Sequence, residues 1–248
     1  MDVCYQSDWG YPCDMPRAYA QPDMTAAPRP QPSLEMETAL WAERHRFVAG
    51  VDEVGRGPLA GPVFAAAVIL DTEARPGWLD DLRDSKELSA RERERLDEAI
   101  RNEAVAYAVG WSTVAEIDAI GIGPANYQAM SRALSALRVR PEYVLIDGPI
   151  KLKHNPLPQR AIVDGDATCM SIAAASIVAK VARDALMCDL DRDYPQYGFA
   201  VHKGYATADH LSAIERHGVC VQHRRSWAAV QRRAAIALEA SGTLSASR

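Results

Sequence analysis

From Phe47 onward, short runs rich in Val, Ile, Ala and Tyr alternate with longer segments whose apolar residues recur at helical spacing. The short runs predict strands over residues 47–52, 63–70, 105–112, 143–147 and 160–164. The periodic segments predict helices over residues 89–103, 124–138, 170–193, 207–217 and 226–239. This alternation is typical of an α/β fold, here a mixed central sheet of about five strands flanked by helices, with a C-terminal helical segment.

The first part of the chain has a different texture. Residues 1 to about 34 show no period of 2 or 3.6 and end in the run Ala-Pro-Arg-Pro-Gln-Pro-Ser. A segment rich in proline and small polar residues cannot bury a core. We therefore predict a disordered N-terminal arm at residues 1–46, one folded domain at 47–240 that includes the C-terminal helices, and a flexible tail at 241–248.

Composition bounds the class of protein. With 248 residues and 48% hydrophobic residues, the chain can form a core of ordinary size, but its apolar stretches are too short or too polar to cross a bilayer. The start, MDVCYQSDWG, lacks the basic and apolar regions of a signal peptide, and the five cysteines form no Cys-x-x-Cys pair. We expect a cytoplasmic protein with reduced thiols and no membrane association.

The charge is unevenly distributed. The net charge is −5, yet from residue 200 onward seven Lys or Arg residues accompany only three acidic ones. Local potential governs contact with a phosphate backbone more than the net charge of the chain does. Nucleic acid therefore remains a possible partner, with a solvated helical face as the alternative explanation of the basic end.

The stretch VAGVDEVGRGP, residues 48–58, resembles a dinucleotide-binding fingerprint because Gly55, Gly57 and Gly61 follow an apolar run. However, only Pro62 separates Gly61 from the next predicted strand, and a parallel crossover needs ten or more residues. We therefore predict an antiparallel pair of strands. The Gly-Arg-Gly then lies in their connection, where a ligand can approach the backbone closely.

Three predicted strands end in acidic residues and glycine: Asp52-Glu53 before Gly55, Asp147-Gly148, and Asp164-Gly165-Asp166. Each Asp-Gly alone is typical of a turn. Adjacent residues of a regular strand face opposite sides, so Asp52 and Glu53 can share a site only where their strand ends. Three such endings together predict a group of carboxylates at one edge of the sheet, where α/β folds place their sites.

Carboxylates that lie close together repel one another unless a cation neutralises them. Oxygen ligands without His or Cys favour Mg²⁺ or Mn²⁺ over zinc. Two such ions can activate a water molecule and stabilise the leaving oxygen in phosphodiester hydrolysis. The pattern therefore favours a metal-dependent enzyme acting on a phosphate ester.

Six motifs in order resemble the type 2 ribonucleases H, specifically bacterial ribonuclease HII. They are residues 50–63 (GVDEVGRGPLAGPV), 84–89 (DSKELS), 144–148 (VLIDG), 165–166 (GD), 171–180 (SIAAASIVAK) and 197–205 (YGFAVHKGY). Each is weak alone, but their common order and spacing make a chance match improbable. The resemblance covers about residues 47 to 227.

The resemblance implies an RNase H-like fold and hydrolysis of the RNA strand in RNA/DNA hybrids. It also implies cleavage of duplex DNA on the 5′ side of a single embedded ribonucleotide, leaving a 3′-hydroxyl and a 5′-phosphate, by a monomer that uses Mn²⁺ or Mg²⁺. The four catalytic and metal-binding positions of the family fall on Asp52, Glu53, Asp147 and Asp166.

The resemblance also implies residues that bind substrate. Gly55, Arg56 and Gly57 match the element that senses the ribose 2′-hydroxyl, the group that distinguishes RNA from DNA. Tyr205 matches the aromatic residue that stacks on the adjoining deoxyribose. We also expect Lys86 to contact a substrate phosphate.

Two further expectations concern charged residues. Arg183 and Asp184 are expected to form a structural ion pair on a helix surface. Asp164 stands where the family usually has lysine, and on a regular strand it would face the same side as Asp166. We hypothesise that Asp164 alters the metal preference or weakens phosphate binding.

Two alternatives from other classes remain. A noncatalytic nucleic-acid-binding relative would keep the fold without the metal chemistry, although all four acids are present here. A two-metal phosphohydrolase of small phosphate esters would need the carboxylates but neither the Gly-Arg-Gly nor Tyr205.

Overall fold

The computed structural model describes residues 31–153 and 155–245. Its centre is a five-stranded sheet with the order β3-β2-β1-β4-β5. The strands are β1 (Val48–Val54), β2 (Val63–Ile69), β3 (Ala106–Ser112), β4 (Tyr143–Asp147) and β5 (Gln159–Ile162). β1 pairs antiparallel with β2 and parallel with β4, so the predicted mixed sheet and the predicted antiparallel pair are both confirmed.

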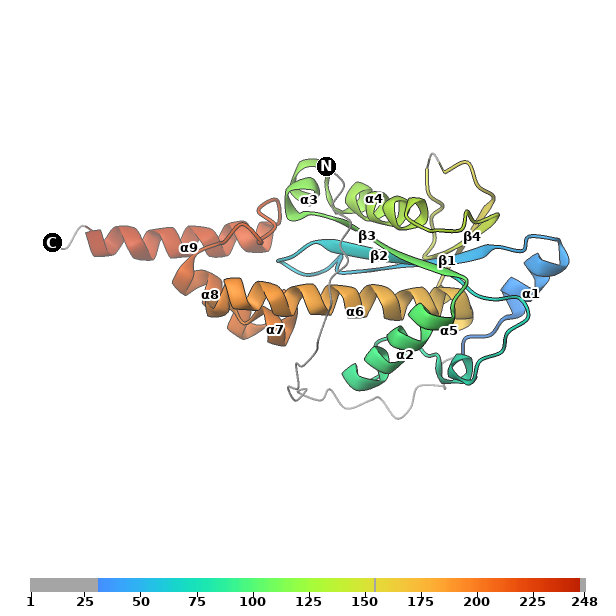
Figure 1. Cartoon of the computed structure of the whole chain (residues 1–248). Coiled ribbons are helices and arrows are strands. Elements are labelled where there is room, and N and C mark those ends of the chain that lie inside the picture. Colours follow the sequence, from blue (N-terminus) through green and yellow to red (C-terminus); the bar gives the residue numbers. More distant parts are fainter. Residues whose placement is uncertain (1–30, 154, 246–248) are drawn as a thin grey trace, which may run out of the picture.

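Helices surround the sheet (Figure 1). The α-helices are α1 (Glu35–Ala42), α2 (Ala90–Glu103), α3 (Val114–Ile120), α4 (Ile122–Ser135), α5 (Gly165–Thr168), α6 (Met170–Asp193), α7 (Phe199–His202), α8 (Ala208–His217) and α9 (Ala228–Ser245). Two short 3₁₀ helices are η1 (Gly77–Asp81) and η2 (Pro195–Tyr197). The five helices predicted from periodicity all form, whereas the shorter ones carry too few turns to show a period.

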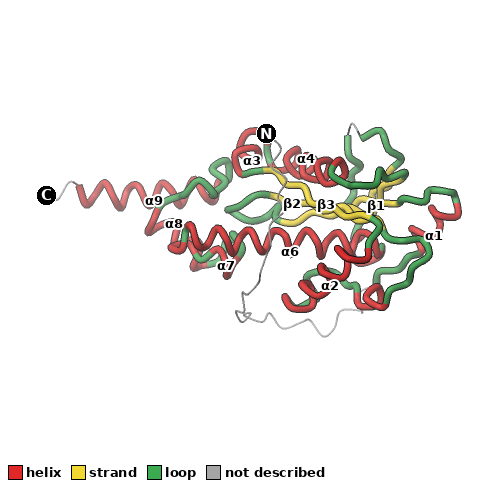
Figure 2. Tube along the Cα trace, viewed as in Figure 1, coloured by secondary structure: helices red, strands yellow, loops and turns green. Residues whose placement is uncertain are grey.

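The two faces of the sheet are covered by different helices. α6 runs lengthwise along one face and α4 covers the other, as the tube in Figure 2 shows. The contact between α6 and β1 is very close: a Cβ atom placed on Gly50 would lie 2.2 Å from the backbone carbon of Ser171. Only glycine permits this approach, so position 50 fixes the start of α6 directly over β1.

Local capping explains where two of the helices begin. Ser89 and Glu92 form a complete capping box at α2, as the predicted start at residue 89 suggests. Thr113 and Glu116 form a second capping box at α3, a helix whose seven residues are too few to show an apolar period. Its Thr-x-x-Glu spacing was the available signal.

The predicted boundary of the arm at residue 47 is wrong for its last part, because α1 lies within residues 1–46 and is packed on the domain. Ser33 forms a parallel bridge with Cys169, and the Glu37 side chain is fully buried. Glu37 Oε1 accepts hydrogen bonds from Ser171 N at 2.8 Å and from Ser171 Oγ at 2.6 Å. The partner of Glu37 lies 134 residues later, which no local pattern reveals. Residues 1–30 of the arm lie outside the described residues.

The C-terminal end also differs from the expectation. The backbone of α9 is helical to Ser245, beyond the domain limit predicted at residue 240. Figure 1 shows the helix extending away from the sheet and its covering layers. Within residues 31–153 and 155–245, no helix combines the length and the apolar character needed to cross a membrane.

Glu37 supplies α6 with a cap that its own N-cap residue, Cys169, does not provide. We predict that Glu37→Ala lowers the free energy of unfolding by about 1–2 kcal/mol through loss of this cap. Urea unfolding of the two proteins measures the difference. Glu35→Ala is the matched control, because Glu35 is exposed and lies on α1, the helix that also carries Glu37. An equal loss in both variants would contradict a capping role.

Burial raises the pKa of Glu37 above its usual 4.5. A folded-state pKa above the unfolded value means that stability is lost as pH rises from about 4.5 through the folded value. Glu37→Gln keeps an acceptor for Ser171 and removes the buried charge. The stability of this variant relative to wild type should therefore rise across that window, and a difference that does not vary with pH would contradict this.

Candidate active site

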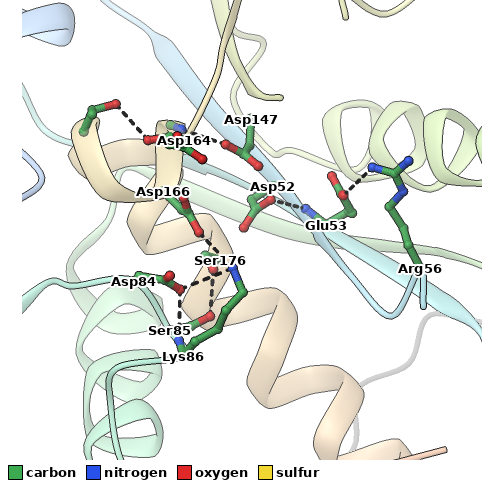
Figure 3. A network of polar contacts seen from close by, with 12 residues as sticks. Asp52, Glu53, Arg56, Asp84, Ser85, Lys86, Asp147, Asp164, Asp166 and Ser176 are labelled. Atoms are coloured by element: carbon green, nitrogen blue, oxygen red, sulfur yellow. Dashed lines mark hydrogen bonds and ion pairs between the residues drawn. The ribbon is translucent and has the colours of Figure 1, made fainter. Parts of the chain in front are cut away.

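Carboxyl groups meet at the edge of the sheet where β1 and β4 end. Asp52, Glu53 and Asp147 each place one oxygen so that all three atoms lie within 4.8 Å of one another. Asp52 and Asp166 are buried, with 5% and 8% exposure. Figure 3 shows Asp52, Asp147 and Asp166 pointing toward a common space and the Glu53 carboxylate beside Arg56. These four residues are called the carboxylate cluster below.

Asp52 and Glu53 come together although the strand does not end between them. Pairing of β1 with β2 continues to Val54, whereas pairing with β4 stops at Val51. Beyond Val51 the edge of β1 that faces β4 is therefore open. The two side chains start on opposite faces, and their oxygens reach the space beside Asp147 from both sides.

Asp166 reaches the cluster from a separate turn. It lies in α5, a helix of four residues that directly precedes α6. The Gly165 N–H donates to Asp147 Oδ1 at 2.7 Å, which joins this turn to the end of β4. The Glu53 N–H donates to Asp52 Oδ1 at 2.6 Å. In both Asp52 and Asp147 a backbone N–H thus binds Oδ1, while Oδ2 is left for another ligand.

The electrostatics of the cluster disfavour four ionised groups. Burial raises the pKa of Asp52 well above its usual value, and the other three carboxylates raise it further. The pKa of Asp147 is raised by burial and by the charge of Asp166. Cations that bind here would relieve both effects, so the donor set suits hard divalent ions.

Lys86 lies beside the cluster on the loop before α2. Its Nζ atom is 3.4 Å from Asp166 Oδ2 and 3.6 Å from Asp84 Oδ1. Burial alone would lower the pKa of Lys86, but the charges of Asp84 and Asp166 outweigh it and raise the pKa. A hydrogen bond of 2.9 Å between Ser85 Oγ and Ser176 Oγ fixes this loop to α6. The side chain stays largely exposed, so its charge is available to a ligand at the cluster.

The expected geometry of Asp164 is wrong. β5 ends at Ile162, and Asp164 adopts a left-handed conformation with φ of 53° before α5 begins. Residues 164 and 166 therefore do not alternate along one strand, and the same-face relation fails. Asp164 is exposed, and its carbonyl accepts from Thr168 Oγ1 at 3.1 Å. The hypothesis about its effect on metal preference loses this geometric support.

The Gly-Arg-Gly lies immediately after β1 and next to Tyr205. Gly55 has φ of +91°, and a Cβ there would lie 2.2 Å from Arg183 Nε. Arg56 Nη1 is 3.2 Å from Glu53 Oε1, which links the loop to the cluster. A Cβ on Gly57 would lie 3.7 Å from the ring of Tyr205, whose side chain is 43% exposed. The structure thus brings together the residues that the sequence singled out in two distant motifs.

The predicted surface ion pair of Arg183 with Asp184 is wrong. Asp184 pairs with Lys180 at 2.7 Å, whereas Arg183 is fully buried and donates only to backbone carbonyls among the described residues. A helical signal existed, because residue 183 lies four positions after buried Ala179 and four before buried Met187. Arg224 is also fully buried, which its place in the basic C-terminal end of the sequence does not reveal.

Comparisons with known proteins identify the family. The family model described as Ribonuclease HII matches residues 49–230. The chain belongs to the ribonuclease HII family. A ribonuclease HII of Desulfitobacterium hafniense (strain DSM 10664 / DCB-2) is 50% identical over 208 residues, which cover 84% of this chain and 78% of the relative. The activity of this chain is therefore that of a ribonuclease H.

Solved structures agree with the ribonuclease HII assignment. The ribonuclease H2 from Pyrococcus horikoshii OT3 matches with a TM-score of 0.65 and 27% identity, covering 76% of this chain and 97% of that one. Bst-RNase HIII in complex with Mn²⁺ has the same fold, with a TM-score of 0.61, 21% identity and coverage of 82% and 74%. The RNase H-like fold implied by the resemblance is confirmed.

The raised pKa of Asp52 predicts a stability effect in the absence of metal. A carboxyl whose folded pKa lies above 3.8 costs stability as pH rises beyond 3.8, and the full cost is present above the folded pKa. Asp52→Asn keeps an acceptor for the Glu53 N–H and removes the charge. In EDTA at pH 8 this ribonuclease HII variant should therefore melt several degrees above wild type, and the difference should vanish below pH 3.8.

Added Mn²⁺ should raise the melting temperature of wild type and should raise that of Asp52→Asn less. Differential scanning fluorimetry with and without Mn²⁺ measures both shifts. Glu98→Gln, at an exposed position within α2, is the matched control and should follow wild type in all conditions. A wild type that is more stable than Asp52→Asn in EDTA at pH 8 would contradict repulsion within the cluster.

Proposed function

We propose that this ribonuclease H hydrolyses the RNA strand of RNA/DNA hybrids and cuts duplex DNA on the 5′ side of a single embedded ribonucleotide. The products are a 3′-hydroxyl and a 5′-phosphate. The observation that carries the proposal is the convergence of Asp52, Glu53 and Asp147 within 4.8 Å, beside a loop and a tyrosine suited to nucleic acid. A monomeric state and a cytoplasmic location stay predictions from the sequence.

The carboxylate cluster would hold the divalent cations, Mn²⁺ or Mg²⁺. The donors are all carboxylate oxygens, and burial together with their mutual repulsion raises the pKa of Asp52 and Asp147. The structure of Bst-RNase HIII, which has the same fold, was solved in complex with Mn²⁺. When bound in a pair, such ions supply an activated water and stabilise the charge on the leaving oxygen.

Backbone contacts prepare the cluster for this task. The N–H groups of Glu53 and Gly165 each hold one oxygen of Asp52 and Asp147. The orientation of both side chains is thus set before a ligand arrives, which lowers the entropy lost on binding. Asp166 lies on the turn that Gly165 joins to β4, so the same contact helps to position it.

The neighbouring loop and aromatic ring would read the substrate. Arg56 and Gly57 are exposed, and the Tyr205 ring lies in ordinary contact distance of position 57. Because glycine has no side chain, the backbone N–H groups of this loop can approach a ribose 2′-hydroxyl closely. An exposed aromatic ring can stack on the adjoining sugar. A hydrolase of small phosphate esters would use neither feature.

Lys86 would contact a substrate phosphate close to the reacting bond. Its charge is held at the cluster by Asp84 and Asp166 and is largely exposed. A lysine is a mobile point charge, which suits a phosphate that shifts during hydrolysis.

Cleavage of labelled duplexes tests the proposal. The substrates are a DNA duplex with one ribonucleotide, an RNA/DNA hybrid and an all-DNA duplex, each with Mg²⁺ or Mn²⁺. Wild type should cut the first on the 5′ side of the ribonucleotide, degrade the RNA of the second and leave the third intact. Asp52→Asn should reduce cleavage by at least about 100-fold, since removing one stabilising group from a catalytic site commonly costs this much.

Glu98→Gln serves as the matched control and should cleave like wild type. A panel of nucleotide monoesters separates the alternatives: hydrolysis of these with no cutting of the duplexes would favour a small-ester phosphohydrolase. Folded wild type that binds the ribonucleotide duplex but never cuts it would instead favour a noncatalytic binding protein.

A further inference from the structure

Two arginines, Arg183 and Arg224, are the largest fully buried side chains of the described residues. Neither forms an ion pair within the part of the chain that the structure describes. Burying an arginine without a carboxylate partner is costly, and an apolar residue would fill the same space at less cost. Their role must therefore lie in the contacts that they make.

Within the described residues, the hydrogen bonds of the two guanidinium groups go to backbone carbonyls. Arg224 donates to the carbonyls of Gly55 at 2.5 Å and Arg56 at 2.8 Å, and also to Gly61. Charged donors make stronger hydrogen bonds than neutral ones, and the planar fork of arginine fixes their directions. Arg224 thus holds two of the three carbonyls of the Gly55-Arg56-Gly57 segment.

Arg183 joins the residues that follow that segment to the loop that carries Tyr205. It donates to the carbonyls of Ala60 at 3.2 Å and Pro62 at 3.1 Å on one side, and to the carbonyl of Lys203 at 3.0 Å on the other. The N–H of Leu59 adds a bond of 2.8 Å to the carbonyl of Gly204. The arginine pair therefore sets the distance between the Gly-Arg-Gly and Tyr205.

The planarity of the peptide bond turns these contacts into a consequence for the surface. In a trans peptide the C=O and the N–H point in opposite directions, and the described residues contain no cis bond. Because the carbonyls of Gly55 and Arg56 point inward to Arg224, the N–H groups of Arg56 and Gly57 point outward. In the described residues neither N–H donates to a protein acceptor, and both residues are exposed.

We propose that Arg224 and Arg183 are positioning residues that aim the N–H groups of Arg56 and Gly57 at the ribonucleotide and so determine discrimination between ribose and deoxyribose. The inference rests on the proposed function, in which this loop reads the 2′-hydroxyl. The two buried charges also lie behind the outward N–H dipoles, which strengthens them as donors to an oxygen of the substrate.

The pKa of Arg224 is consistent with a guanidinium group that stays charged in its buried position. Burial and then the charge of the neighbouring Arg183 lower the pKa of Arg224 to about 9. Arg224 therefore remains charged at neutral pH despite its surroundings.

The test measures discrimination rather than activity alone. Fluorescence anisotropy in Ca²⁺ gives the Kd for a duplex with one ribonucleotide and the Kd for the all-DNA duplex. The discrimination ratio is the Kd of the all-DNA duplex divided by the Kd of the ribonucleotide duplex. Arg224→Met should lower this ratio about tenfold, the effect of losing one good charged hydrogen bond. Arg224→Lys, which keeps the charge but loses the fork, should restore part of it. Under Mn²⁺, KM for the ribonucleotide duplex should rise more than kcat falls.

The matched control is Arg138→Met. Arg138 also donates to backbone carbonyls, those of Ala104 and Val105, but on a different part of the fold. Its discrimination ratio should equal that of wild type. If Arg224→Met does not fold by circular dichroism, Arg224→Lys and Arg183→Lys carry the test and should each lower the ratio by a smaller factor.

The outcomes separate this inference from the proposed function. Wild type that discriminates between the duplexes, with folded Arg224→Met and Arg224→Lys discriminating equally well, would overturn the positioning role alone. Wild type that binds both duplexes equally would overturn this inference, whereas wild type that cuts neither the ribonucleotide duplex nor the hybrid would overturn the proposed function.

Discussion

Repulsion among carboxylates held at one edge of the sheet is the constraint on which the site depends. Asp52 and Asp147 come from adjacent parallel strands, and their pKa values are raised by burial and by neighbouring acids. An arrangement that disfavours its own charges persists only because the surrounding fold is rigid. Divalent cations that bind here would relieve this repulsion, so the site favours them.

That rigidity comes from contacts far apart in the sequence. Gly50 lets the start of α6 lie directly on β1, and Glu37 caps α6 from the N-terminal segment. Arg183 and Arg224 then fix the loop that follows β1. The strand that carries Asp52 is therefore anchored on both sides of the cluster. Chemistry and substrate reading share one continuous piece of backbone, residues 50–57.

Much of this was predictable where the signal is local. Apolar runs gave the five strands, the short link after Gly61 gave the antiparallel pair, and the family motifs gave the candidate site. The failures have two causes. The expected position of Asp164 fails because a left-handed residue interrupts the alternation, and the burial of Arg183 and Glu37 depends on partners such as Pro62 and Ser171, which lie more than 100 residues away. Helical spacing can indicate that such a residue is buried, but one sequence does not show which distant residue it contacts.

The most direct test of the account is an anomalous difference map from crystals grown with Mn²⁺. The account predicts manganese peaks in the space enclosed by Asp52, Glu53, Asp147 and Asp166, with carboxylate oxygens at about 2.0–2.4 Å as expected for a small divalent ion. A well-ordered cluster without a peak at saturating Mn²⁺, or with peaks only elsewhere on the molecule, would contradict the claim that this group of acids is a cation site.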